Sequence, residues 1–195
     1  MIACCSPNNR DIFSYKSDLS FYSKGNFGRE GCLYFARAGA KVVALDNNNI
    51  SLTETINFVK EKCSPKVDPN IISFQCDVTK RISVECAIEN VCQKWGCPHL
   101  LWNNAGYQGK IVPTLEYDVE DFARVMDINV TGMFSVLQVV SKKMAKAKED
   151  GLDEKFSIVN TASVAAMRGT PAMIAYSSSK AAVLAMTVAS AKGEL

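Results

Sequence analysis

The feature that most constrains the fold of this chain is an alternation of short apolar runs with longer amphipathic stretches, which begins near residue 30. The runs that predict buried strands span 41–46, 71–78, 99–106 and 156–163. The stretches with helical periodicity span about 51–62, 82–95, 118–148 and 175 to the end. This order of β-α-β units predicts an α/β fold, a doubly wound parallel sheet with helices on both faces.

Local signals set the expected ends of these helices. Ser51 and Glu54 have the spacing of a capping box, which predicts that the helix over about 51–62 begins at Ser51. Gly96 and Pro98 are expected to end the helix over 82–95.

Composition narrows the classes of function. With 48% apolar and 22% charged residues, the 195-residue chain is expected to bury one sizeable core. The formal net charge of +2 comes without a basic run, which argues against a nucleic-acid partner. The N-terminal segment lacks an apolar signal region, and no apolar run approaches the roughly 18 residues of a membrane span. We therefore expect a cytoplasmic protein with no membrane partner.

Cysteine placement favours reduced core thiols over a disulfide framework, because most of the eight cysteines lie within or beside apolar segments. Those six are Cys32, Cys63, Cys76, Cys86, Cys92 and Cys97. A metal site would depend on the last two together with His99, but the chain has no C-x-x-C pair. No metal is expected.

The most informative motif is AYSSSK, in which Tyr176 and Lys180 are four residues apart. Side chains at i and i+4 share one face of a helix, so the ammonium group is expected near the phenol. Lowering the pKa of a phenol from about 10 to about 7 takes roughly 4 kcal/mol. One cation at about 4 Å supplies an interaction of that order at an effective dielectric constant near 20. Such a phenol is a general acid and base for an alcohol and carbonyl pair, although the spacing also arises by chance.

Three further positions support this chemistry, each with a structural alternative. Ser163 ends a predicted strand, where its hydroxyl is expected to reach a ligand, or else to cap a turn or helix. Asn129 lies in the long helical stretch, where it is a mediocre helix former and either a surface residue or a local break. Asp46 closes a strand at nearly the spacing after Gly28 at which a carboxylate binds adenosine ribose, or else it caps the next helix.

Together with NNAG at 103–106, these motifs resemble the short-chain dehydrogenase/reductase family from Gly25 to the C-terminus. The resemblance rests on GNFG, GAKVVALD, CDV, NNAG, Asn129, IVNTAS and YSSSK, which occur in unbroken order. Within the family, GNFG and NNAGYQG are most similar to NAD-dependent polyol dehydrogenases of the xylitol type. The resemblance implies a Rossmann-type three-layer domain over 23–195, incomplete at the C-terminus, after an atypical segment over 1–22.

The resemblance also implies catalytic roles for four residues. Tyr176 would be the acid and base, and Lys180 would lower its pKa while holding the nicotinamide ribose. Ser163 would donate a hydrogen bond to the substrate oxygen, and Asn129 would hold a water that relays protons towards Lys180. The implied substrate is a small alcohol or carbonyl compound, and the implied assembly is a dimer or tetramer.

The cofactor implied by the resemblance is NAD rather than NADP, because the carboxylate of Asp46 repels the additional phosphate of NADP. Tyr176 and Lys180 would contribute to its binding. The other implied cofactor-binding residues are Gly25, Asn26 and Gly28 in the phosphate loop, Asp77 and Val78 beside the adenine, and Asn104, Ala105 and Gly106 along the cleft.

The chain departs from the family pattern near its start. Phe21 and Tyr22 stand where the family has Thr-Gly, and a tyrosine side chain there would block close approach of a pyrophosphate. The first strand would have to be KSDLS at 16–20, which carries a charge and two serines where a central strand needs continuous apolar residues. Loss of this strand would leave its two neighbours with unpaired backbone groups.

The chain also ends within or just after the helix that carries Tyr176, where family members add two strands and the segment that closes over nicotinamide and substrate. The strand at 156–161 is therefore expected to be an uncovered edge. Two hypotheses follow: an NAD-dependent oxidoreductase, or a truncated, non-catalytic remnant that associates at most through its helices at 118–148 and 175–193.

Overall fold

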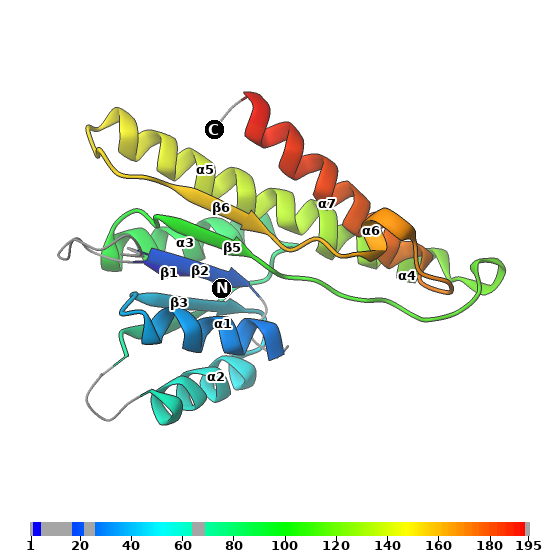
Figure 1. Ribbon diagram of the computed structural model, residues 1–195, viewed down its shortest axis with the longest axis horizontal. Helices are drawn as coiled ribbons and strands as arrows, with labels where there is room; N and C mark the ends of the chain where they lie inside the picture. The colour runs from blue at the N-terminus through cyan, green and yellow to red at the C-terminus, as the bar shows by residue number, and fades with distance from the viewer. Residues whose placement is uncertain (1, 5–16, 22–25, 64–68, 194–195) are drawn as a thin grey trace.

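The computed structural model describes residues 2–4, 17–21, 26–63 and 69–193, which form one sheet between layers of helices (Figure 1). The strands are β1 (Ile2–Cys4), β2 (Ser17–Phe21), β3 (Val42–Asp46), β4 (Ile71–Gln75), β5 (Leu100–Asn103) and β6 (Ser157–Asn160). The α-helices are α1 (Asn26–Arg37), α2 (Asn49–Lys62), α3 (Arg81–Trp95), α4 (Val119–Met126), α5 (Met133–Glu149), α6 (Ala165–Arg168) and α7 (Ile174–Gly193). A 3-10 turn, η1 (Thr114–Glu116), precedes α4, and a π-helical segment, η2 (Asp127–Gly132), joins α4 to α5.

The sheet confirms the predicted α/β class. Its strand order is β4-β3-β2-β1-β5-β6, and the pairs β2–β3, β3–β4, β2–β5 and β5–β6 are all parallel. The short strand β1 runs antiparallel to both β2 and β5, and it was not predicted from the sequence. The carboxyl ends of the parallel strands therefore meet at one edge of the sheet.

The first parallel strand is present where the sequence placed it, so the expectation of unpaired neighbours is wrong. Within β2, Leu19 pairs with Leu101 of β5, and Phe21 pairs with Leu45 of β3. Strand pairing uses backbone groups, which a serine or aspartate supplies as well as a valine does. The apolar pattern was therefore too strict a test for this strand.

Two buried clusters, one on each face of the sheet, make the core. Alternate residues of β3 divide between them, because successive side chains of a strand point to opposite faces. Val43 and Leu45 join the cluster under α3 and α5, whereas Val42 and Ala44 join the cluster under α1 and α2. All five residues of β3 are buried, as expected for a parallel strand covered on both faces.

Two local predictions for the helices are wrong. The capping box at Ser51 does not form, because the Asn48 side chain accepts a hydrogen bond from Ser51 N at 3.1 Å and α2 begins at Asn49. Ser51 is buried inside the helix instead. The single helix expected over 118–148 is interrupted by η2, which contains Asn129; the alternative of a local break at that residue is what the structure has.

The cysteine prediction holds for three of the residues and fails for one. Cys32, Cys63 and Cys76 are buried free thiols, and burial raises the pKa of Cys32 and of Cys76 to about 12. Cys86 is exposed, because it lies on the solvent side of α3. Val84 and Ala87 are among the residues on the buried side of that helix.

Candidate active site

The site centres on Lys180, whose side chain is buried at the carboxyl end of β6. Its relative exposure is 3%, and its Nζ donates a hydrogen bond of 2.7 Å to the carbonyl of Thr161, just beyond the strand. The same nitrogen lies 5.8 Å from the centroid of the Tyr176 ring, so the two residues share one face of α7, as their spacing predicts. Burial disfavours the charged form and lowers the pKa of Lys180 to about 8.

Asn129 and Gly106 lie next to this lysine. Asn129 is fully buried in η2, although it is far from α7 in the sequence. A Cβ atom added to Gly106 would lie 3.5 Å from Asn129 Oδ1 and 3.5 Å from Lys180 Nζ. The glycine therefore lies beside both the amide and the amine, which places these two polar groups on one side of the loop after β5.

A hydrogen-bond chain connects Asn129 to the helix that carries Tyr176. Asn129 Nδ2 donates to Ser179 Oγ at 2.9 Å, and Ser179 Oγ donates to the carbonyl of Tyr176 at 2.8 Å. Ser179 is fully buried. Asn129 and Tyr176, which were predicted from separate motifs, thus belong to one connected cluster.

Ser163 follows β6 and stands two residues after Thr161, the hydrogen-bond partner of Lys180. Its Oγ accepts a hydrogen bond of 3.2 Å from Ala165 N at the start of α6, so the cap alternative is also realised. A serine hydroxyl that accepts one bond still has a proton to donate. The contact with Ala165 therefore does not conflict with a role in binding a substrate oxygen.

A cavity of about 320 Å³ gathers the residues predicted to bind the adenosine half of a cofactor. Its lining includes Asp46, Asp77, Val78 and Ala105, which come from three different strand ends. Arg124 of α4 and Asp127 and Ile128 of η2 also line it, as does Tyr107 from the loop after β5. The volume is within the range of about 300 to 1,000 Å³ that is typical of small-molecule sites.

The two acidic residues that the sequence singled out are each held in place. Asp46 is 3% exposed, and its Oδ1 accepts a hydrogen bond of 2.9 Å from Asn48 N. Asp77 Oδ1 accepts from Thr79 Oγ1 at 2.7 Å, and its Oδ2 pairs with Lys80 Nζ at 3.2 Å. Burial opposes ionisation of Asp77, but these hydrogen bonds hold its pKa below the ordinary value.

The chemistry of this lining fits a nicotinamide dinucleotide cofactor. Val78, Ala105 and Ile128 offer apolar surface to an adenine ring, and Asp46 offers carboxylate oxygens to ribose hydroxyls. Gly28 is buried in the first turn of α1, which follows β2 as a phosphate-binding helix would. Tyr22 and Gly25 lie outside the described residues, as do the side chains of Phe21 and Asn26, so the predicted block of the phosphate loop stays untested. Asn104 directly follows β5.

Several residues of the cluster were not predicted from the sequence. Ser179 was hidden among three consecutive serines, and no local signal separates it from Ser177 and Ser178. Thr161 takes part through its backbone carbonyl, which any residue would supply. Tyr107 directly follows NNAG, and only the structure shows that both its backbone N and its O are bonded to Asn129.

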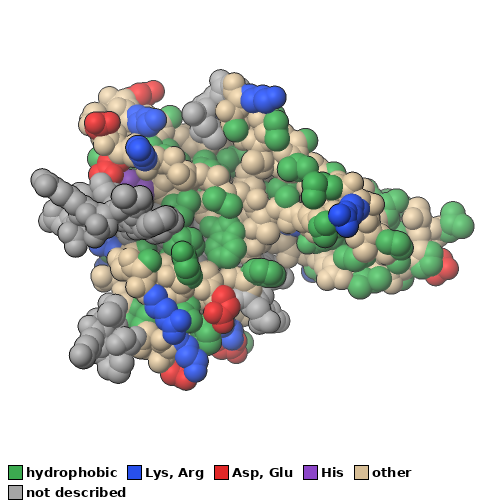
Figure 2. Space-filling model, in the orientation of Figure 1, with side chains coloured by type: hydrophobic (Ala, Val, Ile, Leu, Met, Phe, Trp, Pro, Cys, Tyr) green, Lys and Arg blue, Asp and Glu red, His purple; other side chains and the backbone are tan. Residues whose placement is uncertain are grey.

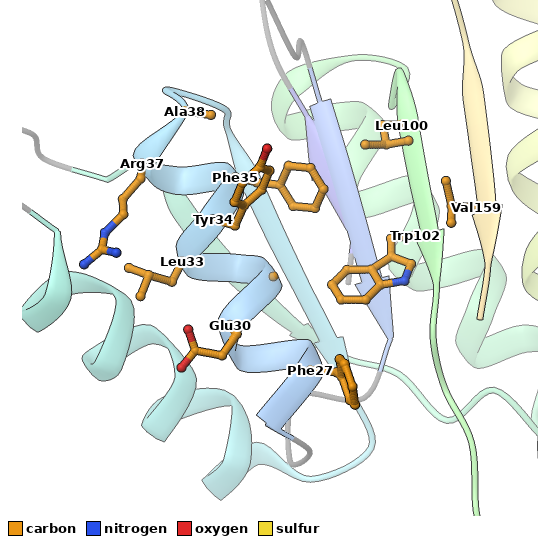
Figure 3. A pocket seen from close by; sticks show the side chains of 11 residues that line it. Phe27, Glu30, Leu33, Tyr34, Phe35, Arg37, Ala38, Leu100, Trp102 and Val159 are labelled. Atoms are coloured by element: carbon orange, nitrogen blue, oxygen red, sulfur yellow. The ribbon is translucent and has the colours of Figure 1, made fainter. Parts of the chain in front are cut away.

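A larger hollow of about 810 Å³ lies away from this cluster, on the α1 face of the sheet. Figure 2 shows hydrophobic side chains gathered at the centre of this face, and Figure 3 shows Trp102 and Val159 turned towards it beside Phe27 of α1. Gly31 packs directly against the Trp102 ring, and a Cβ at that position would overlap it. The hollow lacks the Tyr, Lys and Asn cluster, so its size does not make it the candidate site.

Within residues 2–4, 17–21, 26–63 and 69–193, no three His, Cys, Asp or Glu side chains gather into a group that could hold a metal ion. No helix in this described part combines the length and the apolar content needed to cross a membrane.

Comparison with known proteins gives consistent similarities. A family profile described as short chain dehydrogenase matches residues 23–194. The 3-oxoacyl-(acyl-carrier-protein) reductase of Thermotoga maritima is 34% identical over 165 residues, which are 85% of this chain and 62% of that protein. The L-2,3-butanediol dehydrogenase of Corynebacterium glutamicum is 33% identical over 77% of this chain and 54% of its own length.

Solved structures agree with the sequence relatives. The structure of NAD⁺-bound xylitol dehydrogenase has a TM-score of 0.80 and 38% identity, covering 89% of this chain and 62% of the other. That of levodione reductase has a TM-score of 0.80 and 30% identity, covering 89% and 64%. This chain therefore spans less than two thirds of the length of each of these proteins.

Proposed function

Because the chain belongs to the short-chain dehydrogenase family, we propose that its site serves an NAD-dependent oxidoreductase that interconverts a secondary alcohol and a ketone. The observation that carries this proposal is the buried Lys180, which lies beside the Tyr176 ring and next to Asn129 across Gly106. A buried cation beside a phenol, at the carboxyl ends of parallel strands, suits proton transfer to and from an alcohol oxygen.

In this proposal, Tyr176 takes the alcohol proton during oxidation and returns it during reduction. Lys180, cationic below a pH of about 8, stabilises the Tyr176 phenolate that accepts this proton. Ser163 donates a hydrogen bond to the substrate oxygen, and Asn129 orders the polar groups beside Lys180. Bound NAD would supply the hydride acceptor at C4 of its nicotinamide ring.

A sugar alcohol of the xylitol type is the first substrate to test, because NAD⁺-bound xylitol dehydrogenase is among the similar solved structures. The assay follows the near-ultraviolet absorbance of NADH as purified chain is mixed with NAD and either xylitol or 2,3-butanediol. Alcohol-dependent NADH formation supports the proposal. Well-folded protein that binds NADH without turnover of either alcohol, or of the matching ketones in reverse, contradicts it.

The charges around the adenosine cavity favour NAD over NADP. Asp46, Asp77 and Asp127 line it together with one cation, Arg124, so the wall carries an excess of negative charge. Replacing Asp46 with Ser is expected to raise the ratio of kcat/KM for NADP to that for NAD by about ten-fold or more, since one like-charge repulsion is worth about 1.4 kcal/mol or more. Fluorescence titration with NADPH and NADH measures the same change in binding. An unchanged preference would contradict the assignment of Asp46 to the ribose.

We also propose a homodimer or homotetramer, which apolar surface on α5 and α7 supports. Phe134 of α5 is 47% exposed, and Leu184 and Val188, one turn apart on α7, are 41% and 47% exposed. Burying such side chains in a shared interface stabilises an assembly. Sedimentation analysis is expected to show a dimer or larger species for the natural chain and more monomer for Leu184→Glu. A natural chain that sediments as a monomer at micromolar concentration would contradict the proposal.

A further inference from the structure

Tyr107 is the best-anchored residue of the loop that leaves β5. Its backbone N donates to Asn129 Oδ1 at 2.7 Å, and its backbone O accepts from Asn129 Nδ2 at 2.9 Å. Its phenol donates to Asp121 Oδ1 at 3.1 Å. The Arg124 guanidinium covers one face of the ring, 4.8 Å from its centroid. The residue thus joins the amide of Asn129 at one end to a carboxylate of α4 at the other.

Asp121 fixes this loop from the α4 side. Only 8% of the residue is exposed, and its Oδ2 accepts from Lys110 N at 2.9 Å and from the Tyr117 hydroxyl at 2.8 Å. The hydrogen bond from Lys110 N is the main cause that holds the pKa of Asp121 below its ordinary value, although burial raises it. The carboxylate therefore stays ionised and accepts every bond that is offered.

The loop after β5 packs closely against α4 at Gly109. Gly109 has a φ of +74°, and a Cβ there would lie 2.5 Å from Tyr117 Oη and 2.6 Å from Val125 Cγ2. A glycine is needed both for this backbone conformation and for this approach. The loop is therefore packed against α4 at Gly109, and the phenol of Tyr107 is bonded to the same helix through Asp121.

Tyr107 is the main hydrogen-bond partner of the Asn129 amide among the residues that the structure describes. Its Oδ1 accepts from Tyr107 N, and its Nδ2 donates to Tyr107 O and to Ser179 Oγ. Two of these three bonds go to Tyr107. The orientation of the amide beside Gly106 and Lys180 is consequently set by the place of the Tyr107 backbone.

We propose that Asp121 is a positioning residue, which acts through Tyr107 to hold the Asn129 amide beside Gly106 and Lys180. Its effect on catalysis rests on the proposed function, whereas its effect on the Asn129 to Tyr107 hydrogen bonds does not. The competing explanation is a purely structural link between the loop and α4. If Asp121 positions Asn129, loss of the Tyr107 hydroxyl should affect Asn129 more than loss of the Tyr117 hydroxyl. If the link is purely structural, the two losses should have similar effects.

The test compares Tyr107→Phe with Tyr117→Phe. Each substitution removes one phenol hydrogen bond to Asp121, but only Tyr107 is bonded to Asn129, and Tyr117 is outside the lining of the Asp46 cavity. The hydrogen exchange of the backbone amide at position 107 is measured by NMR in the whole chain of each variant. We expect exchange about ten-fold faster in Tyr107→Phe and in Asp121→Ala, and less than about two-fold faster in Tyr117→Phe. Equal acceleration in both phenylalanine variants, or none in Tyr107→Phe, would overturn the proposal.

Kinetics supply the second readout. Tyr107→Phe and Asp121→Ala are expected to lower kcat about five- to ten-fold with a smaller change in the KM for NAD, and Asp121→Glu to restore part of the loss. A loss confined to KM would overturn the proposed route through Asn129. If the natural chain turns over no alcohol, the proposed function has failed, and the exchange experiment alone decides whether Asp121 orients Asn129.

Discussion

Replacing Tyr176 with Phe is expected to lower kcat for alcohol oxidation by about 10²- to 10⁴-fold, the range that general acid and base catalysis contributes. The substitution removes only the hydroxyl that takes the proton. The ring remains on α7 beside Lys180 Nζ, so the local packing and the contact with the amine are kept. Fluorescence titration is therefore expected to give an NADH affinity within a few-fold of the natural chain.

Tyr34→Phe is the matched control. Tyr34 is an exposed tyrosine on α1, with 63% of its surface accessible, and it is not part of the catalytic cluster. The same assay should give a kcat close to that of the natural chain. If Tyr176→Phe kept more than about a tenth of the activity, an acid and base other than Tyr176 would be required.

Replacing Lys180 with Met is expected to remove a pH dependence of stability that the natural chain shows in mildly alkaline solution. The folded-state pKa of Lys180 is about 8, and its ordinary value is 10.5. Between these values the unfolded chain binds a proton that the folded chain has released, so the free energy of unfolding rises with pH. The rise amounts to about 3 kcal/mol in total, because each pH unit between the two values contributes about 1.4 kcal/mol.

The measurement is urea unfolding of the two chains without cofactor, at several pH values from about 7 to 11. The free energy of unfolding of the natural chain, minus that of Lys180→Met, should rise across this window and be level below a pH of about 8. Lys60→Met is the control, because Lys60 is exposed on α2 and its removal should leave the slope unchanged. A constant difference between the natural chain and Lys180→Met would show that the amine is not desolvated in the folded state.

The parts of this molecule that sequence analysis predicts are those with local signals. β3 is a continuous apolar run, and all five of its residues are buried. Tyr176 and Lys180 share a helix face because their spacing alone dictates it. Asp46 ends β3, and Asp77 and Val78 follow β4; parallel strands bring their carboxyl ends to one edge, where these residues line one cavity.

The parts that the sequence did not predict depend on competition or on distant partners. Asn48 caps α2 in place of the predicted Ser51, because its side chain accepts the hydrogen bond from Ser51 N. The hydroxyl of Tyr107 meets Asp121 through the tertiary fold. No periodicity encodes such a contact, because the path of the intervening loop sets it.

The π-helical segment η2 imposes a condition on chain length. It accommodates an additional residue within one turn, which directs Asn129 inwards while Val125 before it and Met133 after it both remain in the core. Deleting one residue between 127 and 132 would turn α4 by about 100° relative to α5, the rotation of one residue in an α-helix. Asp121 and Arg124 would then leave Tyr107. This stretch, which already holds the buried Asn129 and Gly132, should therefore tolerate neither a gap nor an insertion.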